Sequence, residues 1–172
     1  MLSALGAAGP PSGLEDRLRT FGQFVGSWDL EVSWFAPGGE VVDRAEGEWH
    51  FGWVLGGLAV QDVWIVPRGR RDQPLLEDDG GRGDYGTSLR FFDGTIDAWR
   101  STWIGPVRGL VRTFVAREVA GDVVLTGTFE PGVTTRWSFT EITPTSFTWR
   151  NEERAGADGD WVLLQRFAAL RA

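Results

Sequence analysis

The sequence predicts an all-β protein, a single antiparallel up-and-down β-barrel of about ten strands with one short helix capping one end. Its 172 residues suit one domain. Hydrophobic residues recur at every second position from residue 27 onward, which is the period of half-buried strands. Short turns separate these runs, and closure into a barrel removes the exposed edges of such a sheet. A two-sheet sandwich is the alternative, but the sequence lacks the long crossover that a Greek key needs.

The N-terminal part is expected to hold a flexible segment and then the helix. Residues 1–13 are small and rich in Gly and Pro, so we expect them to be flexible, followed by a single barrel domain over 14–172. Hydrophobic residues then follow at helical spacing, namely Leu14, Leu18, Phe21 and Val25. This pattern predicts an amphipathic helix over residues 14–25, with Ser12 as its cap.

Ten runs with a period of two follow the helix. The expected strands are 27–36, 41–54, 58–67, 84–93, 95–104, 107–118, 122–129, 133–141, 145–154 and 160–170. Turn residues such as Gly, Pro and Asp separate them. Only residues 68–83 form a longer connection, and their mixed charge, Pro and Gly predict either a surface loop without a role or a lid over the barrel.

Composition excludes several classes of function. A net charge of −7 disfavours nucleic acid as a partner, and the absence of Cys excludes disulfides and thiolate chemistry. No run of ~18 apolar residues or signal peptide is present, so we expect a cytoplasmic protein without a membrane partner. No motif for a cofactor or a metal is found, and the sequence leaves a homodimer open. The single histidine, His50, shares its row with Glu46 and Glu48, which favours a surface position over a haem ligand.

The first strand shows which residues face inward. In GSWDLEVSW, residues 26–34, the inward row consists of Trp28, Leu30, Val32 and Trp34. A short helix followed by Gly26-Ser27-Trp28 resembles the G-x-W signature of the calycin superfamily, which includes lipocalins and fatty-acid-binding proteins. The longer pattern FVGSWDLEVSWFAPGG, then GWVLGG and a terminal strand with Trp161, is similar to bacterial lipocalin-like barrels of unknown function. The resemblance implies that Trp28 closes one end of the barrel and that Arg166 or Arg171 packs across its ring.

The inward rows also supply the candidate site. We expect a cavity lined by Trp49, Trp64, Trp99, Trp103 and Trp137 that binds a small, largely hydrophobic ligand. Asp62, Arg112 or Arg150 would fix a polar end of that ligand. An inward Arg needs an anionic companion, either the ligand itself or a carboxylate such as Asp62 or Glu152.

Two other functions remain open from the sequence. One is a cofactor-independent cyclase or isomerase in which Asp62 or Glu152 moves a proton on a hydrophobic substrate. The other is a barrel filled by its own rings, with a structural or interaction role. Asp62→Asn distinguishes catalysis from binding, since it should spare binding and abolish turnover.

Overall fold

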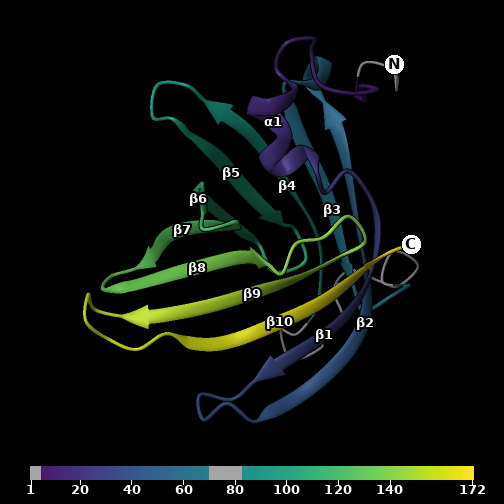
Figure 1. Cartoon of the computed structure of the whole chain (residues 1–172). Coiled ribbons are helices and arrows are strands. Elements are labelled where there is room, and N and C mark those ends of the chain that lie inside the picture. The colour runs from purple at the N-terminus through teal and green to yellow at the C-terminus, as the bar shows by residue number, and fades with distance from the viewer. Residues whose placement is uncertain (1–4, 70–82) are drawn as a thin grey trace.

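The chain forms a closed β-barrel in which every strand pairs with its sequence neighbours. The computed structural model describes residues 5–69 and 83–172. Ten antiparallel strands follow one another around the barrel, and β1 closes it by pairing with both β2 and β10 (Figure 1). This confirms the predicted up-and-down barrel. The elements are α1 Glu15–Gly22, β1 Gly26–Phe35, β2 Val41–Val54, η2 Leu55–Gly57, β3 Ala59–Val66, β4 Asp84–Asp93, β5 Ala98–Gly105, β6 Leu110–Val119, β7 Asp122–Glu130, β8 Val133–Thr140, β9 Ser146–Ala155 and β10 Val162–Arg171.

The helix is shorter than expected and Ser12 does not cap it. Its N-cap is Leu14, which has no side-chain cap hydrogen bond. A turn in which the Leu14 amide donates to the Pro11 carbonyl at 3.1 Å precedes the helix, so Ser12 lies two residues upstream of the cap position. β5 and β6 also begin later than predicted, at Ala98 and Leu110, because the preceding turns use more residues.

The helix closes the end of the barrel at which the odd-numbered strands begin. The Trp28 indole N–H donates to the Phe24 carbonyl at 2.7 Å, and the guanidinium carbon of Arg171 lies 4.2 Å from the centroid of a Trp28 ring. Arg171 also donates to the Val25 carbonyl at 3.0 Å. Of the two cations expected over Trp28, the structure therefore selects Arg171. Two features of this joint favour glycine at position 26. Its φ of 133° is a backbone conformation that other residues rarely adopt, and a Cβ there would collide with the Arg171 guanidinium.

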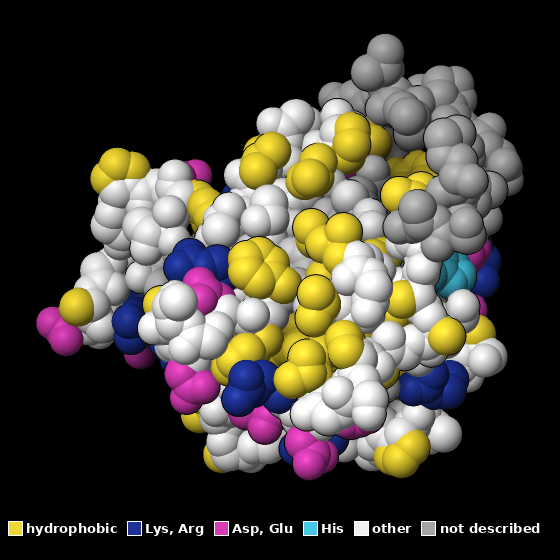
Figure 2. All heavy atoms as spheres, turned by 90° about the horizontal axis from the view of Figure 1, so that it is seen from above, with side chains coloured by type: hydrophobic (Ala, Val, Ile, Leu, Met, Phe, Trp, Pro, Cys, Tyr) yellow, Lys and Arg dark blue, Asp and Glu magenta, His cyan; other side chains and the backbone are white. Residues whose placement is uncertain are grey.

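The N-terminal segment and the β2–β3 turn share this end of the molecule. The Ala7 amide donates to the Trp53 carbonyl at 2.9 Å. Viewed from above, this face shows hydrophobic side chains gathered near its middle, with charged side chains mostly toward the margin (Figure 2). Leu55 and Leu58 of the turn are among the exposed large hydrophobic residues. Within residues 5–69 and 83–172, no helix has both the length and the apolar character needed to cross a bilayer.

Candidate ligand-binding cavity

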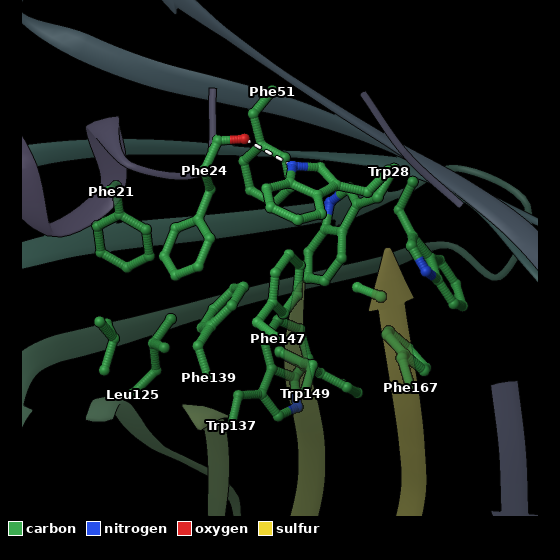
Figure 3. Close-up of a cluster of buried hydrophobic side chains, with 14 of the residues drawn as sticks. Phe21, Phe24, Trp28, Phe51, Leu125, Trp137, Phe139, Phe147, Trp149 and Phe167 are labelled. Atoms are coloured by element: carbon green, nitrogen blue, oxygen red, sulfur yellow. Dashed lines mark hydrogen bonds between the residues drawn. The ribbon is translucent and has the colours of Figure 1, made fainter. Parts of the chain in front are cut away.

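The interior of the barrel divides into a filled half and a half that contains a cavity. Near the helix, the Phe21, Phe24, Trp28 and Phe139 side chains are fully buried and pack against one another (Figure 3). The other half holds an open cavity, with about 110 Å³ of space for the centres of water-sized molecules. Six of the ten Trp side chains line it, namely Trp34, Trp49, Trp64, Trp103, Trp137 and Trp149. The barrel is thus plugged at the helix end and hollow toward the opposite end.

Stacked rings hold the cavity wall in place. Phe167 of β10 lies between Trp64 and Trp149, with ring centroids 5.4 and 4.3 Å away and nearly parallel planes. Trp49 meets Phe167 edge-on at 5.9 Å. Such offset and edge-to-face contacts fix ring orientations beyond simple burial. The wall is therefore formed before any ligand arrives.

The opposite wall depends on a glycine. Gly86 of β4 pairs with Trp64 of β3, and a Cβ at this position would collide with the Trp103 indole. The missing side chain lets that indole lie close against the β4 backbone. Trp103 then contacts Trp64 and Trp137 edge-on at 5.8 and 6.3 Å. The Trp137 indole N–H donates to Asn151 Oδ1 at 3.1 Å, which fixes that ring too.

Several polar atoms of the lining residues are buried without a partner. Among the described residues, four such atoms make no hydrogen bond, namely the indole nitrogens of Trp49, Trp64 and Trp149 and the hydroxyl oxygen of Ser88. All four residues line the cavity. A buried donor left unsatisfied costs about 1–3 kcal/mol. Neighbouring side chains cover these atoms, so a ligand acceptor reaches them only when a ring shifts.

Charged side chains lie at the cavity mouth. Arg112 belongs to the inward row of β6, as predicted, and its guanidinium carbon lies 5.0 Å from the Phe129 ring centroid. Arg108, in the β5–β6 turn, also lines the cavity. Across the described residues, neither arginine forms an ion pair or a hydrogen bond through its side chain. Asp84 is the carboxylate of the lining, and it accepts the Tyr85 amide at 2.8 Å.

Asp62 points into the barrel but binds another protein side chain. Asp62 and Arg90 form an ion pair whose side chains are 0% and 1% exposed. Asp62 Oδ1 also accepts the Ser88 amide at 2.9 Å, and Arg90 lies over the rings of Phe21 and Phe51. Asp62 does not line the cavity. Its catalytic role stays a prediction, and these contacts favour a structural role.

Arg150 and Glu152 lie on the outer face of the barrel, which corrects their expected place in the cavity. Trp149 of β9 points inward, so strand alternation directs Arg150 and Glu152 outward. Glu152 pairs with Arg136 at 2.9 Å and with Arg150 at 3.3 Å. These side chains border a separate outer groove over β7–β9. The structure therefore does not bring them to the ligand site, and their proposed roles there stay untested.

Trp99 is inward but lies in the filled half. It is 2% exposed and meets Phe21 of the helix edge-on at 5.0 Å. Trp99 is the first inward aromatic residue of β5, a strand that begins at the helix end. The residue therefore belongs to the plug and not to the cavity wall, unlike the other four predicted tryptophans.

Two further predictions concern His50 and the connection 68–83. His50 lies on the outer face as predicted, with Nδ1 2.9 Å from Ser27 Oγ and Nε2 3.0 Å from Glu48 Oε2. Most of the connection 68–83 falls outside the described residues. Of its described part, Gly83 lines the cavity.

The sequence prediction missed several lining residues. Trp34 and Trp149 shared rows with inward residues and could have been found from strand alternation. Phe167 lies on an inward row as well and could have been found in the same way. Ser88 and Gln165 also lie on inward rows, but small or amide side chains give no hydrophobic signal. Arg108 sits in a turn, where alternation does not apply.

Comparisons with known proteins show the fold. No known family model and no curated protein matches this sequence. The S-type phycobiliprotein lyase CpeS from Guillardia theta has a similar structure, with 12% identity, 94% of each chain covered and a TM-score of 0.52. A protein of unknown function from the DUF3598 family of Nostoc punctiforme also matches, with 10% identity, 90% of this chain and 98% of that chain covered, and a TM-score of 0.26. The likeness to the lyase, together with the closed ten-stranded barrel, confirms the antiparallel up-and-down barrel fold that the sequence predicts.

Proposed function

We propose that this protein binds a small, largely hydrophobic molecule in the barrel cavity. The observation that carries the proposal is the contrast between the two halves of one interior. The same barrel that buries Phe21, Phe24 and Trp28 in a packed cluster at one end leaves an open cavity among six tryptophans at the other. Protein interiors are close-packed, so an aromatic-walled space of this kind favours an occupant over simple packing.

The wall supports binding at a low cost of ordering. Phe167 is fixed between Trp64 and Trp149, so these rings lose little freedom when a ligand enters. A flat apolar ligand gains about 25 cal/mol for each Å² of apolar surface it buries.

The proposal is limited to binding. A cyclase or isomerase needs a carboxylate free to move a proton beside its substrate. Asp62 is bound to Arg90, and Glu152 is bound to two arginines on the outer face. The likeness to the phycobiliprotein lyase supports only the barrel architecture. At 12% identity, the binding residues of one protein cannot be assigned to the other.

Filling the cavity with a larger side chain should weaken binding strongly. Gln165 lines the cavity, pairs with Trp34 across β1 and β10, and is half-buried. We expect Gln165→Trp to weaken binding of the neutral fluorescent probe N-phenylnaphthylamine by at least about tenfold, because the indole takes the ligand's place. The affinity is measured by the rise in probe fluorescence on titration.

Arg166→Trp is the matched control, because the neighbouring residue of the same strand faces outward. It adds the same side chain and should leave the affinity within about twofold of the wild type. Circular dichroism and thermal unfolding confirm that both variants fold. Absence of saturable binding to the wild-type protein, or equal binding by the folded Gln165→Trp variant, would overturn the proposal.

A further inference from the structure

Counted over the described residues, the lining of the cavity carries a charge opposite in sign to that of the whole protein. The chain carries a net charge of −7. The described residues that line the cavity include two arginines, Arg108 and Arg112, and one carboxylate, Asp84. A cationic excess at this opening of an acidic protein attracts anions locally, although the surrounding surface repels them.

Neither arginine is neutralised by the part of the chain that the structure describes. Three other arginines of the barrel have carboxylate partners there: Arg90 binds Asp62, Arg100 binds Asp93, and Arg136 binds Glu152. Arg112 instead lies on an inward row between Leu110 and Phe114, with its guanidinium over Phe129. Its charge is half-buried among apolar groups, a position in which a cation normally has an anion beside it.

We infer that the ligand is an amphipathic anion, which inserts its apolar body among the tryptophans and leaves one carboxylate-sized anionic group at the mouth, where Arg112 and Arg108 bind it. The inference rests on the proposed binding function and deepens it. It also sets the orientation of the ligand. The inner arginine, Arg90, is already paired with Asp62 and does not line the cavity, so the lining arginines that have no carboxylate partner among the described residues lie at the entrance.

A matched pair of probes isolates the anionic group. Anilinonaphthalene sulfonate and N-phenylnaphthylamine share one ring skeleton, and only the first carries a charge. We expect Arg112→Gln to weaken binding of the sulfonate by about three- to tenfold, as for a partly screened charge-assisted contact. The neutral probe makes no charge contact, so its affinity should fall clearly less than that of the sulfonate in the same variant.

Further variants separate charge from shape. Arg112→Lys keeps the charge and should recover most of the sulfonate affinity, whereas Arg108→Gln combined with Arg112→Gln should lose more than either alone. Arg166→Gln makes the same charge change on the outer face and should affect neither probe. Added salt should weaken binding of the sulfonate more than that of the neutral probe.

The outcomes separate this inference from the proposed function. If the neutral probe binds and Gln165→Trp blocks it, but the arginine variants change both probes equally or neither, the anion is not recognised and only the inference fails. If neither probe shows saturable binding to the wild-type protein, the proposed function fails with it. Selective loss of sulfonate binding in the Arg112 variants supports the inference.

Discussion

Asp62→Asn should lower the free energy of unfolding by about 3–5 kcal/mol, the loss typical when one partner of a buried ion pair is removed. The substitution leaves the Arg90 guanidinium charged, 1% exposed and held between the rings of Phe21 and Phe51. An uncompensated charge in that setting costs far more than the hydrogen bond that Asn retains. The change is measured by urea unfolding monitored with circular dichroism.

A double variant provides the control for the ion pair. Asp62→Leu combined with Arg90→Met removes both charges and should recover part of the stability lost by Asp62→Asn, because no charge stays buried. The ligand site lies elsewhere, so folded Asp62→Asn should bind N-phenylnaphthylamine within about twofold of the wild type. Unchanged stability of the single variant would show that the pair is not structural, and would restore Asp62 as a candidate for proton transfer.

Phe139→Ala should lower the free energy of unfolding by a similar amount, about 3–5 kcal/mol, because it opens a cavity in the filled half of the barrel. Phe139 is 0% exposed and contacts Phe24, Trp49 and Phe147 with ring centroids 4.6, 5.4 and 5.5 Å away. Rings held from several sides cannot collapse into the new space. Urea unfolding measures this loss as well.

Phe129→Ala is the matched substitution at the open end. Phe129 is half-buried near the mouth and contacts Phe114 at 5.0 Å. Since solvent already reaches this region, the loss of stability should be clearly smaller than for Phe139→Ala. Equal losses at the two positions would contradict the division of the barrel into a plugged half and a hollow half.

Most of the fold could be predicted from the sequence because alternation and turns are local signals. The G-x-W signature placed Trp28 at a closed end, and Arg171 does pack across it. The cap of the helix was mispredicted, because the turn between Pro11 and Leu14 shifts the helix start away from Ser12. The turn includes Gly13 with a φ of 84°, a backbone conformation that the spacing of hydrophobic residues does not reveal.

The site was harder to predict, because for each residue one must know whether it points into or out of the barrel and also at which end of the barrel it lies. Alternation alone places Arg150 on the face opposite Trp149, so its outward position was predictable. In an up-and-down barrel, odd-numbered strands all begin at the end that follows the helix, so Trp99 at the start of β5 had to lie in the plug. The pairing of Asp62 with Arg90 joins β3 and β4 across a register that hairpin turns alone do not fix.

The indole N–H signals of the ten tryptophans test the central claim most directly, in a proton–nitrogen correlation spectrum recorded during titration with N-phenylnaphthylamine. The account predicts that the signals of the six cavity residues, Trp34, Trp49, Trp64, Trp103, Trp137 and Trp149, shift as the probe binds. Those of Trp28, Trp53, Trp99 and Trp161, which do not line the cavity, should stay in place. Shifts confined to the second group, or spread equally over both, would contradict binding inside the hollow half of the barrel.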